Sequence, residues 1–123
     1  MPKKQKNILL IEDEHMIRDM YITMLEQENL KIFEALTTEE ADQILNKEKI
    51  DLVLLDIYLP KEDGLAYLEK LKQKQKKLPT VLILTNMEGK EYRARAKELG
   101  VKDYFLKTDY QPLELLELIK QYL

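Results

Sequence analysis

Short, mainly apolar segments alternate with longer amphipathic segments along this chain, five times in strict order. An unbroken apolar run such as Ile8–Ile11 is typical of a strand that is buried on both faces. Strands of this kind that alternate with helices form a parallel sheet covered by helices on both sides. The chain has 123 residues, the usual size of one domain. The pattern therefore predicts a single α/β domain over residues 1–123, in which residues 1–6 are a basic N-terminal tail.

The boundaries of the elements follow from the same pattern and from local signals. Thr37 and Glu40 have the spacing of a helix-capping box, Gly100 suits a left-handed helix C-terminus, and Pro112 suits a first helical turn. The expected strands cover residues 8–11, 31–35, 52–56, 81–85 and 103–107. The expected helices cover residues 15–29, 37–47, a segment with a buried stripe of Leu65, Leu68 and Leu71, residues 89–99, and a last segment from Pro112.

Composition excludes several classes of protein. The absence of Cys rules out disulfides and thiolate metal sites and fits a reducing compartment. No apolar run approaches the roughly 20 residues of a membrane helix, and Ile8–Ile11 is too short for a signal peptide. A net charge of −3 argues against nucleic-acid binding by the domain as a whole. We therefore expect a cytoplasmic protein that contacts neither membrane nor nucleic acid directly.

Polar residues follow the apolar strands where a ligand site is expected. In open α/β sheets, ligands bind beyond the carboxyl ends of the strands. The first strand ends in Glu12 and Asp13, the third in Asp56, the fourth in Thr85 and the fifth in Lys107. If the central strands are adjacent, these side chains converge on one pocket.

Three carboxylates in one pocket require a compensating charge, because like charges and burial both raise carboxyl pKa values. Lys107 is one candidate compensator, and a hard divalent cation such as Mg²⁺ is another. An ionised aspartate such as Asp56 can itself be a nucleophile and accept a phosphoryl group. The metal, Lys107 and the hydroxyl of Thr85 would then neutralise the phosphoryl oxygens.

Taken in order, the motifs resemble those of the receiver domain of bacterial two-component response regulators, over essentially the whole chain. The resemblance implies a flavodoxin-like (βα)5 three-layer sandwich, with a five-stranded parallel sheet in the order 2-1-3-4-5. The segments that carry the resemblance are Ile11-Glu12-Asp13, Leu55-Asp56, Leu59-Pro60, Asp63-Gly64, Leu84-Thr85 and Asp103-Tyr104-Phe105-Leu106-Lys107.

The resemblance also implies roles for the acidic residues. Asp56 would be the phosphoacceptor, and a sensor histidine kinase or phosphotransfer protein would donate the phosphoryl group from a phosphohistidine. Glu12 and Asp13 would hold Mg²⁺ together with Asp56 and the backbone carbonyl of Tyr58. Such a chain is a signalling switch and not a conventional enzyme, although it assists its own phosphorylation and dephosphorylation.

The resemblance implies a switch as well. Thr85 would bond the phosphoryl group and move on activation, Lys107 would pair with Asp56 or its phosphate, and the ring of Tyr104 would turn inward as Thr85 moves. A downstream protein would read the face made by the fourth helix, fifth strand and last helix. The domain would be a monomer or a weak, phosphorylation-dependent dimer.

Three positions depart from the commonest receiver pattern: Thr108, Asn86 and Tyr58. Thr108 follows Lys107, where the family usually has a proline preceded by a cis bond, so this peptide is either trans or strained. Asn86 follows Thr85, where the family favours a smaller residue. We hypothesise that Asn86, together with Tyr58 and Met87, sets the lifetime of the phosphorylated form.

Simpler interpretations of single residues remain open from sequence. The acids after the first strand could merely cap the first helix. Thr85 could cap the fourth helix, Tyr104 could be an ordinary half-buried strand aromatic, and His15, the single histidine, is expected to be a surface residue.

The last helix has an unusually wide apolar face, because Leu115, Leu118 and Tyr122 widen the face formed by Leu113, Leu116 and Ile119. That surplus could pack against the fourth helix or form a partner surface.

Two alternative functions also stay open. One is a non-phosphorylated protein-interaction module that keeps the fold but has lost the switch. The other is a phosphatase with an aspartate nucleophile, which wants a second carboxylate where Tyr58 stands. A flavin or nucleotide binder is disfavoured, because no Gly-rich phosphate loop follows the first strand.

Overall fold

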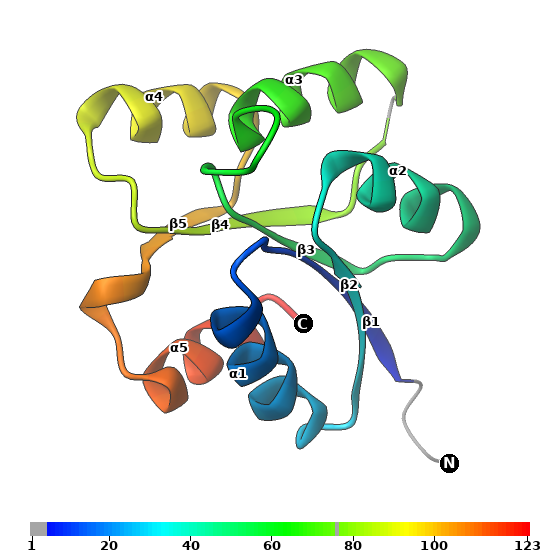
Figure 1. The fold of residues 1–123 in the computed structure, drawn as a ribbon, viewed down its shortest axis with the longest axis vertical. Coiled ribbons are helices and arrows are strands. Elements are labelled where there is room, and N and C mark those ends of the chain that lie inside the picture. The colour runs from blue at the N-terminus through cyan, green and yellow to red at the C-terminus, as the bar shows by residue number, and fades with distance from the viewer. Residues whose placement is uncertain (1–4, 76) are drawn as a thin grey trace.

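A twisted parallel sheet runs through the centre of the molecule, in a computed structural model that describes residues 5–75 and 77–123 (Figure 1). Within these residues the strands are β1 (Lys6–Ile11), β2 (Leu30–Ala35), β3 (Leu52–Leu55), β4 (Thr80–Thr85) and β5 (Asp103–Leu106). The helices are α1 (His15–Glu26), α2 (Thr38–Lys47), α3 (Gly64–Lys74), α4 (Lys90–Glu98) and α5 (Pro112–Lys120), with a short 3₁₀ turn, η1 (Lys107–Asp109). No helix in this described part of the chain is both long and apolar enough to cross a membrane.

The strand order is β2-β1-β3-β4-β5, and every pairing is parallel. The predicted fold class and strand order are therefore confirmed. In the register, Ile11 lies beside Leu55, and Leu55 lies beside Ile83. Glu12 and Asp56 consequently leave neighbouring strands at the same level, which brings their side chains together.

Helices cover both faces of the sheet, because the strands point apolar side chains alternately to each side. Helices α2, α3 and α4 lie on one face, and α1 and α5 lie on the other (Figure 1). Leu9 and Ile11 belong to the core beneath α2–α4, whereas Ile8 and Leu10 belong to the core shared with α1 and α5. All four side chains are almost fully buried, and burial of one such side chain contributes about 1.5–3 kcal/mol to stability.

Side-chain caps fix where several helices begin. The Thr37 hydroxyl accepts a hydrogen bond of 3.2 Å from the Glu40 amide, as the sequence predicted. Glu40, however, accepts from the amide of Leu36 and not from that of Thr37, so the reciprocal bond closes one residue earlier than in a standard capping box. At α5, Gln111 and Glu114 form the complete box, and Pro112 occupies the first turn.

Several boundaries and faces differ from the sequence prediction. Helix α1 ends at Glu26 instead of Asn29, because Asn29 has a left-handed φ of 57° that a helix cannot continue through. The basic tail is also shorter than expected: Lys6 already belongs to β1, and residues 1–4 lie outside the described residues. Helix α1 buries Tyr21, Met24 and Leu25, whereas Met16 is 84% exposed and Met20 is also exposed.

The last helix packs differently from both expectations. Helix α5 lies beside α1 on the face opposite α4, so the packing of α5 against α4 that the sequence suggested is wrong (Figure 1). The surplus apolar residues Leu115, Leu118 and Tyr122 pack into the core that α1 shares, whereas Leu113 is exposed. Most of the wide apolar face of α5 is therefore core and not a free partner surface.

Candidate functional site

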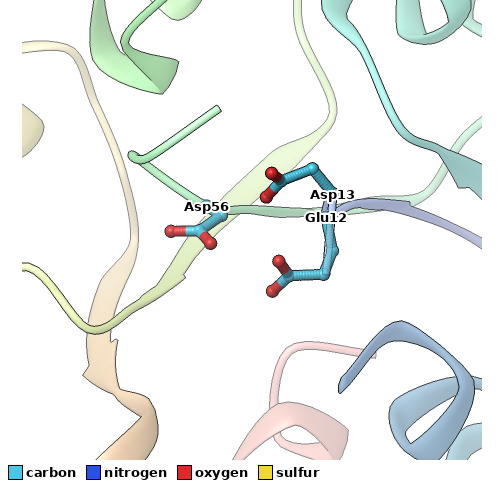
Figure 2. A group of neighbouring side chains, drawn as sticks. All are labelled: Glu12, Asp13 and Asp56. Atoms are coloured by element: carbon cyan, nitrogen blue, oxygen red, sulfur yellow. The ribbon is translucent and has the colours of Figure 1, made fainter. Parts of the chain in front are cut away.

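Three carboxylates converge at the carboxyl edge of the central strands. Glu12 and Asp13 directly follow β1, and Asp56 directly follows β3. Oxygen atoms of all three lie within 4.8 Å of one another, and the side chains project into the same space (Figure 2). Glu12 is only 1% exposed and Asp56 only 6%, whereas Asp13 is half-buried. The predicted acidic pocket therefore exists, and most of its negative charge is shielded from water.

Lys107 supplies the opposing charge. Its ammonium lies 2.9 Å from Asp56 Oδ2 and also donates to Glu12 Oε1. Lys107 is the first residue of η1 and not the last of β5, so a tight turn follows the strand at this position. No peptide bond among the described residues is cis, so the bond between Lys107 and Thr108 is trans. The missing proline therefore does not prevent Lys107 from reaching both carboxylates.

The electrostatics of the pocket agree with this geometry. Burial, reinforced by the nearby charge of Asp56, raises the pKa of Glu12 to about 7 even though Lys107 acts in the opposite sense. For Lys107, burial lowers the pKa, but the hydrogen bond to Glu12 and the charge of Asp56 outweigh it and raise the pKa overall. Lys107 is thus a permanent cation, and the pocket still holds more negative than positive charge when Glu12 is ionised.

Three donors orient the Asp56 carboxylate. Lys107 donates to Oδ2, while the hydroxyl of Thr85 and the amide of Tyr58 donate to Oδ1 at 2.7 Å and 3.2 Å. Thr85 is fully buried and in turn accepts a hydrogen bond of 3.2 Å from the amide of Met87. Thr85 does not cap α4, because the N-cap of that helix is Gly89. The simpler interpretation of Thr85 as a helix cap is therefore wrong.

Tyr104 connects the far side of this network to the surface of the domain. Its hydroxyl donates to the backbone carbonyl of Met87, and its ring lies 4.6 Å from the guanidinium carbon of Arg93 on α4. A continuous series of hydrogen bonds therefore runs from Asp56 through Thr85 and the backbone of Met87 to Tyr104. Tyr104 is half-buried, but its bond to the β4–α4 loop distinguishes it from an ordinary strand aromatic.

Tyr58, Asn86 and Met87, the residues hypothesised to set the lifetime of the phosphorylated form, differ in their surroundings. Tyr58 is 71% exposed, and it lines a cavity of about 350 Å³ together with Met87 and Tyr92. Asn86 is exposed and does not line that cavity. Tyr58 and Met87 therefore share a cavity that Asn86 does not line.

Two residues matter to the site that sequence reasoning did not identify. Gly64 lies so close to Asp56 that a Cβ atom at residue 64 would overlap the backbone carbonyl of Asp56. Asp63-Gly64 is one of the segments that carry the receiver resemblance, but nothing in the sequence indicates this close contact. Arg18 is a buried arginine of α1 whose guanidinium contacts the backbone of Glu12 and Asp13. A charged residue in a helix is normally placed on the solvent side, so its spacing gave no signal of this position.

The remaining polar residues of the β1–α1 loop have local roles. Glu12 Oε2 accepts from the amide of Glu14, but α1 has neither a side-chain cap nor an acidic residue in its first turn within the described structure. Helix capping alone therefore does not account for the acids. His15 is exposed, with Nδ1 facing Arg18 and Nε2 lying 3.2 Å from Asp19. The expectation that His15 is a surface residue is confirmed.

The donor set fits a hard divalent cation. Carboxylate oxygens are the ligands that Mg²⁺ prefers, and here three of them surround one space. Two of the three carboxylates are buried, so the charge of a bound cation would offset a real desolvation cost. The acidic cluster is thus chemically suited to Mg²⁺.

A family model described as the response regulator receiver domain matches residues 8–120. The chain belongs to this family. As a sequence, this receiver is 34% identical over 113 residues to the regulatory protein VanR of Enterococcus faecium, a match that covers 92% of the chain and 48% of VanR. It is 36% identical to the phosphate regulon transcriptional regulatory protein PhoB of Escherichia coli, covering 94% of the chain and 50% of PhoB.

Solved receiver structures agree with the fold. A CheY-like receiver domain protein from Methanospirillum hungatei superposes with a TM-score of 0.86 at 29% identity, covering 96% of this chain and 93% of that one. The BeF₃-activated receiver domain of RstA from Klebsiella pneumoniae superposes with a TM-score of 0.84 at 26% identity, covering 95% and 97%. The receiver is a signalling domain of two-component systems and not a conventional enzyme. It spans about half the length of these curated relatives.

Proposed function

We propose that Asp56 of this receiver accepts a phosphoryl group from a phosphohistidine of a sensor histidine kinase or phosphotransfer protein, with Mg²⁺ bound. The observation that carries the proposal is the setting of Asp56. Its carboxylate lies beside two further acids and is oriented by Lys107, Thr85 and the amide of Tyr58. A preorganised, buried carboxylate opposite a cation suits phosphoryl transfer, which depends mainly on positioning and charge neutralisation.

The proposed transfer is a displacement at phosphorus. An oxygen of the Asp56 carboxylate forms a bond to phosphorus while the bond between phosphorus and the imidazole nitrogen of the donor breaks. The electron pair of that bond stays with the imidazole, so no redox change occurs. Lys107 and Thr85, which now donate to Asp56, lie where they can donate to the phosphoryl oxygens instead.

Glu12, Asp13 and Asp56 are the residues that would hold Mg²⁺, together with the carbonyl of Tyr58. A bound dication supplies charge neutralisation for the carboxylates and the phosphoryl oxygens. The role of Glu12 and Asp13 in this proposal is to present hard oxygen ligands from the end of β1, next to the nucleophile on β3.

The proposed output runs through Thr85 and Tyr104. If the Thr85 hydroxyl turns toward a phosphoryl oxygen, its hydrogen bond with the Met87 amide changes. The backbone of Met87 then shifts, and Tyr104 moves with it because its hydroxyl donates to the Met87 carbonyl. A downstream protein would then recognise the face of α4, β5 and α5, or a second receiver would bind there in a weak dimer. The phosphate would act by biasing an equilibrium between two conformations.

Exposed apolar side chains support a protein as the phosphoryl donor. Met16, Leu36, Tyr58 and Leu113 are all large, exposed and located just after the carboxyl ends of strands or at the starts of the helices that follow. A small-molecule donor would not need these four exposed apolar side chains, whereas a protein donor would bury them against its own surface.

The absence of Cys fits a reducing compartment, and we propose that the phosphoryl transfer takes place in the cytoplasm.

Phosphorylation can be tested on the purified domain. We expect Mg²⁺ with acetyl phosphate to add the mass of one phosphoryl group, and Mg²⁺ with beryllofluoride to shift amide resonances around Asp56, Thr85 and Tyr104 in ¹H–¹⁵N spectra. Asp56→Asn should abolish both effects, while Asp109→Asn, which changes an exposed aspartate, should abolish neither. An unchanged wild-type spectrum and mass would favour the alternative, a receiver-like interaction module that is not phosphorylated.

A further inference from the structure

Arg18 is only 5% exposed, although it belongs to a helix that covers one face of the sheet. Its Nη1 donates to the backbone carbonyl of Glu12 at 3.1 Å and approaches the carbonyl of Asp13 at 3.5 Å. One guanidinium nitrogen therefore contacts the main chain of both acids that follow β1. These are the same two residues whose carboxylates face Asp56.

An ion pair does not explain why Arg18 is buried. Within the described residues its nearest carboxylate is that of Glu34, which lies 3.9 Å from Arg18 Nε and is half-exposed. Ion pairs of that kind contribute about 0–1 kcal/mol. Arg18 Nε itself has no hydrogen-bond partner in the described structure, so the buried guanidinium is incompletely satisfied. Burial of a charge under these conditions is costly, and the contacts to Glu12 and Asp13 are the compensation that the structure offers.

We infer that Arg18 is a positioning residue that fixes the Glu12–Asp13 turn so that both carboxylates face Asp56, with which they would hold Mg²⁺. This inference rests on the function proposed above. Among the described residues, Arg18 forms no hydrogen bond or ion pair with the carboxylates of Glu12 and Asp13; it binds their backbone carbonyls. With the carbonyls held there, rotation of the turn is restricted, and the two carboxylates stay directed at the pocket.

His15 holds the Arg18 guanidinium from a second side. Arg18 Nη2 lies 3.0 Å from His15 Nδ1, and His15 Nε2 lies 3.2 Å from Asp19. This arrangement assigns the acceptor role to Nδ1 and the donor role to Nε2. The guanidinium plane is thereby held at two of its nitrogens, by the Glu12 carbonyl and by His15.

Groups that orient metal ligands typically change metal affinity about 10–100-fold when they are removed. We therefore expect Arg18→Met, which keeps much of the length of the side chain and removes its donors, to raise the Mg²⁺ dissociation constant by about tenfold or more. Arg18→Lys should give an intermediate value, because a single ammonium cannot reproduce the fork of the guanidinium. Isothermal titration calorimetry with Mg²⁺ alone measures the effect without phosphorylation.

Two control variants separate positioning from simple loss of charge. Glu34→Gln removes the weak ion pair, and Lys97→Met removes an exposed cation of α4. Both should leave the Mg²⁺ dissociation constant within about twofold of the wild type, since exposed charges act weakly on a buried site. A folded Arg18→Met that binds Mg²⁺ as tightly as the wild type, or more tightly, would overturn the inference. If Arg18→Met does not fold, Arg18→Lys decides the question by the same criterion.

A second readout does not depend on the metal. In EDTA, amide hydrogen exchange at Asp13 and Glu14 should be faster in the Arg18 variants than in the wild type, while exchange in β3 should be unchanged. Unaltered exchange at these two amides would contradict the positioning role. If the wild type binds no Mg²⁺, the proposed metal site fails, and the exchange measurement still decides whether Arg18 holds the turn.

Discussion

The hydroxyl of Thr85 donates a hydrogen bond of 2.7 Å to Asp56 Oδ1, across the junction of β3 and β4. The same hydroxyl oxygen accepts from the amide of Met87 at 3.2 Å. Thr85 therefore connects Asp56 directly to the β4–α4 loop. Because its side chain is fully buried, a change at Asp56 cannot leave Thr85 and the loop both unaffected.

Thr85→Ala should separate the binding of beryllofluoride at Asp56 from the structural change at Met87 and Tyr104. The variant should still bind Mg²⁺ and beryllofluoride, because the acidic residues and Lys107 remain. Amide shifts at Met87 and Tyr104 should be lost or much reduced, since the two hydrogen bonds of the Thr85 hydroxyl, to Asp56 and from the Met87 amide, are absent. Thr85→Ser keeps the hydroxyl and should retain the shifts. Wild-type shifts at Tyr104 in Thr85→Ala would show that the switch does not run through this hydroxyl.

Gly64→Ala should disturb both stability and the site. A Cβ atom at residue 64 would overlap the backbone carbonyl of Asp56, so the β3–α3 loop must move. Forcing extra atoms into a packed region costs about 1–3 kcal/mol, and here the shift should also displace Asp56, the proposed phosphoacceptor. Urea unfolding and titration with beryllofluoride measure the two effects.

Gly100→Ala is the matched control for Gly64→Ala. Gly100 has a left-handed φ of 83°, and a Cβ there would meet only the end of Lys72 at 3.5 Å. This variant should lose about 1–2 kcal/mol through backbone strain and should bind beryllofluoride as the wild type does. Equal loss of beryllofluoride binding in both variants would mean that the close approach of Gly64 to Asp56 has no special role.

The alternation of apolar segments with helices predicted the parallel sheet, and the residues that end its strands predicted the convergence of the acidic residues with Lys107. The strand order was implied by the resemblance to receiver domains. Wholly apolar runs alternating with helices are typical of central parallel strands, and parallel strands place their carboxyl ends at one edge. The residues at those ends, such as Asp56 and Thr85, were therefore located without coordinates.

Some features of the structure could not be predicted from sequence, because they depend on contacts to backbone atoms or on where the core ends. Arg18 looks like a solvent residue until the carbonyls of Glu12 and Asp13 are seen beside it. Met16 and Leu113 sit at apolar helical positions, but both lie exposed in a first helical turn. Hydrophobic periodicity does not show where the core ends.

Tyr58 and Met87 should affect the lifetime of the phosphorylated form more than Asn86 does. They line one cavity together. The amide of Tyr58 donates to Asp56 and the amide of Met87 donates to Thr85, so both side chains start close to the proposed phosphorylation site and can limit the approach of water to an acyl phosphate. Alanine substitution at Tyr58 or Met87 should change the dephosphorylation rate severalfold, measured by loss of label from the phosphorylated domain. Asn86→Ala is the internal comparison, because Asn86 is exposed and outside that cavity. Unchanged rates at Tyr58 and Met87 would remove all three residues from the lifetime hypothesis.

The metal-free domain should become less stable as pH rises between about 4.5 and 7, relative to a variant that lacks Glu12. Burial raises the pKa of Glu12 from 4.5 to about 7. The folded state thus holds this proton more tightly than the unfolded state, so the contribution to stability is complete below pH 4.5 and is lost as pH approaches 7. A shift of this size corresponds to a few kcal/mol, on the order of 1.4 kcal/mol for each pH unit.

Glu12→Gln keeps the shape of the side chain and cannot ionise, so its stability should lack this component. We expect the difference in unfolding free energy between Glu12→Gln and the wild type to grow in favour of the variant from pH 4.5 to pH 7 and then to level off. Urea unfolding in EDTA measures it. Glu26→Gln changes an exposed residue of α1 and should track the wild-type curve. A constant difference between Glu12→Gln and the wild type would mean that Lys107 keeps Glu12 ionised throughout this range, because the ammonium donates directly to Glu12.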